Sequence, residues 1–372
     1  MKKRAIAMLL TAAAALGLCG CSALYKKEYL SVSEYTEGSY DDYEGYMCEV
    51  SSFDELKAAI IKMVAEHSDE ERIRFSDYEG NPQSDLAQAC WEVKSETALA
   101  SYAVDYMSYD PIRVVNYYEA VVYIAYKHGE KDIAAIVNLR SAEELAENMA
   151  EVLGSLSNYA VYQLPNAVLT EEQVTALVLD AYMSEPTSCV VMPTVQVKLH
   201  PESGIFRIVE VELYYGRTQA VLMEMKQELS ERITELSGRL QKDDKNVFAL
   251  DAYNLLASNC QYDPDGKIRQ ERQLESDLGA TAYGALSQGC ADSQGIASAY
   301  SALCRTAGIP CVVVSGSVDK TPHFWNIVRL DGEYFHVDVS ADSSWGMGNS
   351  FLMSDEQMLT RYWWNIEQQK LP

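Results

Sequence analysis

The stretch Gly289-Cys-Ala-Asp-Ser293-Gln-Gly295-Ile-Ala-Ser-Ala-Tyr300 decides the expected fold of this chain. Asp292 and Ser293 are residue types that cap helix starts, so a tight loop should lead into a helix near Ser293. Gly308 should end that helix in a left-handed conformation, and Val312–Val314 then predicts a short buried strand. Four residues at helical spacing should form the buried stripe of the helix: Ile296, Tyr300, Leu303 and Cys304.

A two-stranded hairpin is predicted downstream of this helix. The dipeptide Asp331-Gly332 favours a two-residue turn and separates two strand-like runs. In that register His323 and Asp338 become diagonal neighbours on one face of the sheet, roughly 7–8 Å apart. A carboxylate at that distance can orient an imidazole. His336 lies on the same face but in the middle of its strand, and we interpret it as a packing residue.

These motifs together resemble the transglutaminase-like superfamily, a branch of the papain-like Cys-His-Asp enzymes. Members begin the helix with a nucleophilic cysteine in a pattern close to G-x-x-x-C-Q-G-Y-A. Residues Gly289–Ala297 follow that pattern, except that Ser293 occupies the cysteine position and Ile296 the tyrosine position. The resemblance covers about residues 245 to 342 and includes three further motifs: Tyr262-Asp263, Tyr283-Gly-Ala-Leu286 and His323-Phe-Trp-Asn326.

The resemblance implies a papain-like α+β fold and a set of site residues. His323 corresponds to the catalytic base and Asp338 to the carboxylate that orients it, with Ser293 at the degenerate nucleophile position. It also implies binding roles for Gln294, Trp325 and Asn326, and Trp325 is a candidate ligand contact together with the exposed tyrosines.

The serine leaves three interpretations of the site open. In the first, the nucleophile is lost and the domain binds a peptide or glycan; Asp292 supports this, because an anion beside the nucleophile opposes a thiolate. Asp292 and Ser293 are, however, also ordinary helix caps. In the second, Ser293, His323 and Asp338 form a hydrolase of low activity. In the third, Cys290 becomes the nucleophile after a shift of the loop.

The first residues have the three-part pattern of a bacterial lipoprotein signal. A charged start, Lys2-Lys3-Arg4, precedes the apolar run Ala5–Leu18, which is too short to span a bilayer. The run ends in Leu18-Cys19-Gly20-Cys21, which resembles a lipobox with Cys21 as the acylated residue. Residues 1–20 are therefore predicted to be a signal peptide and residues 21–50 a tyrosine-rich acidic tether. The mature protein should be exported and lipid-anchored to the outer face of the bacterial cell membrane.

Two similar segments follow the tether, and we interpret them as repeated α-β-α-β-β units at residues 51–140 and 141–217. Each begins with a Ser-x-x-Glu capping box, at Ser52 and at Ser141. The last strand of the second unit alternates apolar residues with Glu210 and Glu212, which predicts one dry and one wet face. Residues 218–244 should form a connecting helix and residues 245–372 the transglutaminase-like domain. The units contain three scattered histidines expected at the surface or in turns: His67, His128 and His200.

Charge and cysteine content narrow the partners. The chain of 372 residues has a net charge of −25. Removal of the three basic residues of the signal peptide leaves 27 basic and 55 acidic residues. Such a charge repels nucleic acid, so no nucleic acid partner is expected. The cysteines lack metal-ligand spacing, and neither a metal nor a cofactor is predicted.

The predicted function is that of a cell-surface lipoprotein with a catalytically degenerate transglutaminase-like domain. Its partner should be a peptide, a protein or a cell-wall polymer, and the Cys21 lipid should hold it at the membrane. The rival is an active hydrolase or acyl-transferase on peptide or isopeptide amides, using Ser293 or Cys290 with His323 and Asp338. A third possibility is a scaffold whose function resides in the repeated units.

Overall fold

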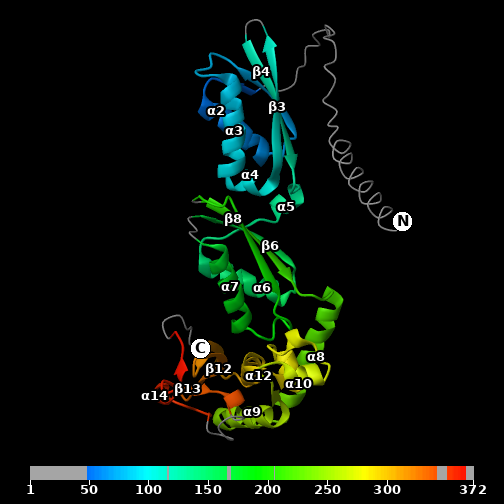
Figure 1. Ribbon diagram of the computed structural model, residues 1–372, viewed down its shortest axis with the longest axis vertical. Coiled ribbons are helices and arrows are strands. Elements are labelled where there is room, and N and C mark those ends of the chain that lie inside the picture. Colours follow the sequence, from blue (N-terminus) through cyan, green and yellow to red (C-terminus); the bar gives the residue numbers. More distant parts are fainter. Residues whose placement is uncertain (1–47, 115–116, 166–168, 205, 342–349, 366–372) are drawn as a thin grey trace, which may run out of the picture. The chain divides into compact units, whose positions relative to one another are not determined.

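The computed structural model describes residues 48–114, 117–165, 169–204, 206–341 and 350–365 (Figure 1). These residues belong to one compact unit that spans residues 47–372. The expected signal peptide 1–20, the lipidated Cys21 and the tether up to residue 47 lie outside the described residues. The last three residues of the expected tether, Cys48–Val50, instead form a strand, because they pair with a neighbouring strand and Val50 is buried.

The first unit is a four-stranded sheet with helices on one face (Figure 1). The strand order is β1-β2-β4-β3, with β1 parallel to β2 and the other neighbours antiparallel. The core contains the apolar stripe of the first helix, which includes Leu56 and Ile60. In chain order the elements are β1 (Cys48–Val50), α2 (Phe53–Ala65), β2 (Glu70–Phe75), α3 (Pro82–Glu96), α4 (Ala98–Ala103), β3 (Val104–Val114) and β4 (Tyr117–Tyr126).

The second unit has the same strand order and directions as the first. Its sheet is β5-β6-β8-β7, with β5 parallel to β6 and the rest antiparallel. Its elements are α5 (Glu130–Ala134), β5 (Val137–Asn138), α6 (Ala142–Gly154), β6 (Tyr159–Pro165), α7 (Glu171–Ser184), β7 (Thr194–His200) and β8 (Phe206–Tyr214). Each sheet thus begins with a short strand that the predicted α-β-α-β-β pattern lacks. An origin by duplication stays a prediction.

The starts of α2 and α6 match in detail. Ser52 and Ser141 cap these helices, and each hydroxyl accepts the backbone N–H three residues later at 3.3 Å. The glutamates of the two boxes, Glu55 and Glu144, accept from the backbone N–H of the residue before the cap instead of the cap itself. At the starts of both helices, these side chains therefore bind backbone amide groups that would otherwise lack partners.

Part of the outer face of the second sheet is buried, although the sequence predicts that this face is exposed to solvent. Helix α4 of the first unit packs on it, and Tyr102 lies in one apolar cluster with Val161 and Ile208. Glu210, predicted on the exposed face with Glu212, is only 5% exposed for that reason. Glu210 retains polar partners there, because its carboxylate lies 3.0 Å from His200 Nε2.

The three scattered histidines converge at this junction. His128 stacks on Tyr102 with ring centroids 4.1 Å apart, and His200 meets the same ring edge-on at 5.6 Å. His67 Nε2 lies 3.2 Å from the carbonyl oxygen of His128. The fold therefore brings together residues that are far apart in the sequence, whereas the sequence pattern predicts separate surface or turn positions.

The C-terminal part surrounds a third four-stranded sheet, of order β13-β12-β11-β14, in which all neighbours are antiparallel. A pair of short parallel strands, β9 and β10, lies before the central helix. The elements are α8 (Gln219–Ser237), α9 (Lys245–Asn259), β9 (Gln261–Tyr262), α10 (Lys267–Glu271), η1 (Ser276–Leu278), α11 (Ala282–Leu286), β10 (Cys290–Ala291), α12 (Ser293–Thr306), β11 (Cys311–Val318), β12 (Thr321–Leu330), β13 (Glu333–Val337), η2 (Val339–Ala341), α14 (Asp355–Met358) and β14 (Tyr362–Trp363).

Helix α12 lies at the centre of this part and is buried on nearly all sides, not along one stripe. Every residue from Gly295 to Cys304 is buried. A side chain at Gly295 would collide with the carbonyl oxygen of Gly279, so the glycine permits close approach of two backbone segments. Gly308 follows the helix in a left-handed conformation, with φ of 63°, as predicted.

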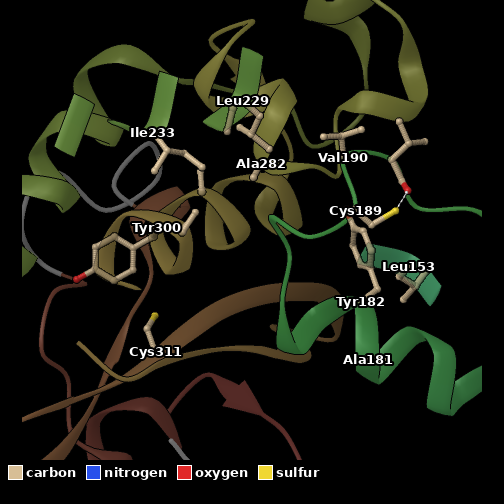
Figure 2. Packing of buried hydrophobic residues seen from close by; sticks show 14 of the residues in the cluster. Leu153, Ala181, Tyr182, Cys189, Val190, Leu229, Ile233, Ala282, Tyr300 and Cys311 are labelled. Carbon is tan, nitrogen blue, oxygen red and sulfur yellow. Dashed lines mark hydrogen bonds between the residues drawn. The ribbon is translucent and has the colours of Figure 1, made fainter. Parts of the chain in front are cut away.

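One hydrophobic core joins the second unit to the C-terminal part. Figure 2 shows Tyr182, Cys189 and Val190 of the second unit in the same cluster as Leu229 of α8 and Tyr300 of α12. Helix α8, expected to be a plain connection, buries its predicted apolar face in this cluster. The first unit has a separate core of its own.

No helix among the described residues is long and apolar enough to cross a membrane. The seven cysteines from Cys48 onward are all unpaired. Within the described ranges, no group of three or more His, Cys, Asp or Glu side chains is arranged to hold a metal ion.

Candidate active site

The hairpin has the predicted register and brings His323 to Asp338. Its turn residues Asp331 and Gly332 both have positive φ, 53° and 89°, as the favoured two-residue turn requires. Leu330 pairs with Glu333. His323 Nε2 lies 2.7 Å from Asp338 Oδ2, and both side chains are buried. Because a carboxylate only accepts, Nε2 carries the proton and Nδ1 is the nitrogen that can accept one.

Asp338 receives four hydrogen bonds, which fix its orientation. Oδ2 accepts from His323 and from the hydroxyl of Tyr362, both at 2.7 Å. Oδ1 accepts from the hydroxyl of Ser340 at 2.6 Å and from the backbone N–H of Ala341 at 3.1 Å. These donors engage both oxygens of the carboxylate, so the buried Asp338 is held in place as a hydrogen-bond acceptor for the imidazole.

Ser293 stands at the first position of α12, close to the strand that carries His323. Its Oγ accepts the backbone N–H of Phe324 at 3.3 Å, and Ser293 is 8% exposed. The pairing of β12 with β13 ends at Asn326 and Val337, so Phe324 lies beyond the last paired residue. The serine hydroxyl therefore occupies the position of a strand partner for this amide, which is a structural role that a thiol would fill less well.

Asp292 is the N-cap of α12, and its carboxylate accepts the N–H of Gly295 at 3.0 Å. Burial raises the pKa of Asp292 above its ordinary value, opposed by the N–H groups of Gly295 and Gln294 and by the charge of Arg269. The helix start thus has a built-in acidic group directly before the nucleophile position. Its negative charge there would oppose formation of an oxyanion or a thiolate.

Cys290 does not share the site with His323. It is fully buried in β10, and its thiol points to Asp263, with Sγ 3.8 Å from Oδ2. Burial, together with the negative charge of Asp263, raises the pKa of the Cys290 thiol. A buried thiol held in its protonated form is a poor nucleophile, so the arrangement does not favour Cys290 as the attacking group.

The loop before α12 is held by a buried arginine. The Arg269 guanidinium donates to the carbonyl oxygens of Glu275 and Cys290 and to the side chain of Gln288. Asp263 accepts the backbone N–H of Arg269 at 2.8 Å. The Tyr-Asp motif after α9 therefore supports the loop that precedes Ser293, which explains in physical terms why it accompanies the site.

The expected binding residues lie inside the fold. Trp325 is 0% exposed and its indole N–H donates to His336 Nδ1 at 2.9 Å, so the expectation of a ligand contact at Trp325 is wrong. Asn326 is 1% exposed and donates to the carbonyl oxygens of Ala297 and Val312. Gln294 is half-buried against the sulfur atoms of two methionines of the second unit, Met183 and Met192.

His336 is a packing residue, as expected, with 1% of its surface exposed. Its Nε2 lies 2.9 Å from Asp355. Burial lowers the pKa of the His336 imidazole, opposed by the Asp355 carboxylate. It therefore contributes to the core between β12 and the C-terminal segment.

Two residues at the site were not found from the sequence. Ser340 lies in the short helix η2 just after β13, and Tyr362 lies in β14 near the end of the described chain. Neither belongs to a recognisable motif. The spacing Asp-x-Ser at Asp338 and Ser340 was the one local signal, since a hydroxyl two residues on can bond a carboxylate.

Comparisons with known proteins agree with this geometry in one segment. Residues 233–339 match the family model described as the transglutaminase-like superfamily. The match begins inside α8 and ends just after Asp338. No curated protein matches the chain.

Three solved structures are similar at low identity. One is described as a TGase, with 13% identity and a TM-score of 0.28, covering 63% of this chain and 64% of that one. A candidate cysteine protease from Cytophaga hutchinsonii has 10% identity and a TM-score of 0.23, with 40% and 62% covered. A candidate protease from Parabacteroides distasonis has 10% identity and a TM-score of 0.21, with 60% and 49% covered.

This chain spans less than two thirds of the length of each of these structures. Their TM-scores are too low to support an inference, so the assignment depends on the family match and on the residues described above. The chain therefore has a mixed α+β fold with a transglutaminase-like domain at its C-terminal end.

Proposed function

We propose that this protein is an exported lipoprotein whose transglutaminase-like domain binds peptide or cell-wall material without cleaving it. One observation carries the proposal. The Ser293 hydroxyl, at the position where the family has its nucleophilic cysteine, accepts the Phe324 amide and stands next to the acidic cap Asp292. The remaining His323–Asp338 pair then serves as a polar wall of a binding site.

Restoring the thiol tests this assignment. In Ser293→Cys, a thiol at the helix start near the strand of His323 should become reactive, because the helix terminus and an imidazolium together favour the thiolate more than the Asp292 charge opposes it. We expect iodoacetamide to label the variant at pH 6 much faster than the wild type, and His323→Ala to abolish the gain. The native cysteines also react with iodoacetamide, and labelling of the wild-type protein measures this background.

A serine-reactive fluorophosphonate provides the opposing test on the wild-type protein. Degeneracy predicts no labelling of Ser293. Labelling that disappears in His323→Ala would overturn the proposal in favour of a hydrolase or acyl-transferase.

That second function is favoured by one specific observation, the intact and buried His323–Asp338 pair. In such an enzyme Ser293 Oγ attacks an amide carbonyl carbon and His323 Nδ1 takes the hydroxyl proton. The proton then passes to the leaving amine as the carbon–nitrogen bond breaks. Ser293 would have to release the Phe324 amide or share its hydroxyl between the two groups.

The anchoring part of the proposal is supported by the sequence of residues 1–21. Metabolic labelling with an alkyne fatty acid in a bacterial host should tag the full chain and not Cys21→Ser. Equal labelling of the two proteins would refute lipidation at Cys21. Fractionation should then place the variant outside the membrane pellet.

The proposed ligand class follows from charge. A mature chain with 27 basic and 55 acidic residues favours neutral or amine-bearing ligands over polyanions. A soluble form starting at Ser22 should sediment with purified peptidoglycan, and Asp338→Asn should weaken that binding if the old catalytic groove holds the ligand. Unchanged sedimentation of a form lacking residues 245–372 would favour the scaffold alternative.

A further inference from the structure

Strand β14 carries a tyrosine to the candidate site from outside the segment that matches the family. Val318 of β11 pairs with Tyr362, and Ser317 pairs with Trp363. Arg361 adds an ion pair with Asp319, and its carbonyl oxygen accepts the Asp319 N–H at 3.1 Å. These contacts fix β14 at the edge of the sheet, against β11, and β12 with His323 lies on the other side of β11.

The Tyr362 hydroxyl donates to Asp338 Oδ2 at 2.7 Å, the same oxygen that holds His323 Nε2 at 2.7 Å. Tyr362 is 4% exposed, and its ring meets Trp325 edge-on with centroids 5.1 Å apart. Burial, followed by the charge of Asp338, raises the pKa of Tyr362 far above its ordinary value. The phenol therefore stays protonated and acts toward Asp338 as a donor.

Two donors on one carboxylate oxygen compete for the same negative charge. The Tyr362 hydroxyl withdraws part of the charge that Oδ2 would otherwise offer to the His323 N–H, and it also holds the carboxylate in plane with that N–H. The second oxygen is engaged by Ser340 and by Ala341 N–H, so the carboxylate cannot turn away.

We propose that Tyr362 is a positioning residue of the His323–Asp338 pair, setting the strength of the hydrogen bond between them through Asp338. It acts without touching a ligand. The proposal rests on the proposed function only in taking His323 as the group that faces the ligand. The hydrogen bond between His323 and Asp338 can be measured in the absence of any ligand.

The test is the Nε2–H proton resonance of His323, because protons shared with a carboxylate resonate further downfield as the bond strengthens. The chain has five histidines, so a ¹⁵N-histidine-labelled sample gives few signals, and His323→Gln assigns the one of interest. Tyr362→Phe keeps the ring and removes the hydroxyl. The His323 signal should move downfield in this variant, and its exchange with water should slow.

Tyr182→Phe is the matched control. Tyr182 is a buried tyrosine whose hydroxyl has no hydrogen-bond partner among the described residues, so its removal should leave the His323 signal in place. If Tyr362→Phe lowers thermal stability and the His323 signal does not move, Tyr362 is merely structural and the proposal is wrong.

A second substitution covers the case in which Tyr362→Phe does not fold. Fluorotyrosine at position 362 keeps the hydroxyl and makes it a stronger donor, so the His323 signal should move upfield. A downfield move or no move would contradict the proposal. Neither measurement uses ligand binding or labelling of Ser293, so the proposed function can fail while this inference stands, and the reverse.

Discussion

At the scale of single residues, the serine at position 293 gives the start of α12 a hydrogen-bonding hydroxyl. The hydroxyl is smaller and a better hydrogen-bond acceptor than a thiol, and here it satisfies the Phe324 amide beyond the end of a strand pairing. The residue therefore has a stability role that can be separated from any chemistry.

Ser293→Ala should lower the free energy of unfolding by about 1 kcal/mol, because the half-buried Phe324 amide loses its acceptor. Urea unfolding followed by circular dichroism measures the change. Ser298→Ala is the matched control on the same helix: Ser298 is 0% exposed and its hydroxyl has no partner among the described residues. Losing that hydroxyl should leave stability unchanged or raise it. Equal losses in both variants would contradict the structural role of Ser293.

The site residues differ in how far the sequence could predict them. His323 and Asp338 follow from the Asp331-Gly332 turn, because a two-residue hairpin fixes register for the residues beyond it. Trp325, on the same face of its strand as His323, was a candidate ligand contact. Alternation assigns a face but does not say which face is covered, and here the segment with Tyr362 covers it. Tyr362 had no signal, since its neighbours in space come from a distant strand.

At the scale of elements, α12 depends on its N-cap, and the cap has a pH dependence. The folded state raises the pKa of Asp292, chiefly through burial. A carboxyl group whose pKa is higher in the folded state contributes stability at low pH, and that contribution is lost as pH rises through the folded pKa. At neutral pH the charged Asp292 therefore costs stability, although its oxygen still caps the helix.

Asp292→Asn should raise the melting temperature at pH 7, because the amide oxygen can still accept from Gly295 without carrying a charge. The gain should shrink as pH falls below the folded pKa of Asp292 and vanish below its unfolded value near 3.8. Thermal melts from pH 3 to pH 8 measure the difference. A variant that is less stable than wild type at pH 7, with a deficit that disappears towards pH 3, would show that the charge at the cap is favourable.

At the scale of the whole molecule, the two N-terminal sheets have the same topology but different outer faces. The register makes Arg72 and Glu119 of the first sheet equivalent to Val161 and Ile208 of the second. The apolar pair receives α4, whereas the charged pair is held within an ion-pair cluster with Arg74. The outer face of the first sheet is thus polar at the positions where that of the second sheet is apolar.

This difference also shows why the sequence could predict the strands but not the burial of Glu210. The alternation of Glu210 with Val209 and Val211 predicts the strand and the face that is buried in the core. What covers the other face is the helix of another unit, about 100 residues earlier in the chain. Local patterns cannot encode such a contact, so the histidines and Glu210 were assigned to solvent.

The shared core leads to a prediction about cooperativity. The second unit and the C-terminal part contribute to one hydrophobic cluster, so residues 139–372 should unfold together, while the first unit, with its own core, should unfold separately. Calorimetry on the chain from residue 47 should show two transitions. Leu56→Ala, in the first core, should lower one of them, and Leu153→Ala, in the second unit, should lower the other.

A cut at the predicted domain boundary sharpens this test. A fragment of residues 245–372 lacks α8 and the second unit, and it would leave buried residues of α11 and α12 such as Ala282 and Tyr300 without part of their cover. It should melt well below a fragment of residues 139–372, because lost apolar burial weakens a core by about 25 cal/mol per Å². Equal melting temperatures would mean that the C-terminal part is an independent domain, and that its contact with the second unit contributes little to its stability.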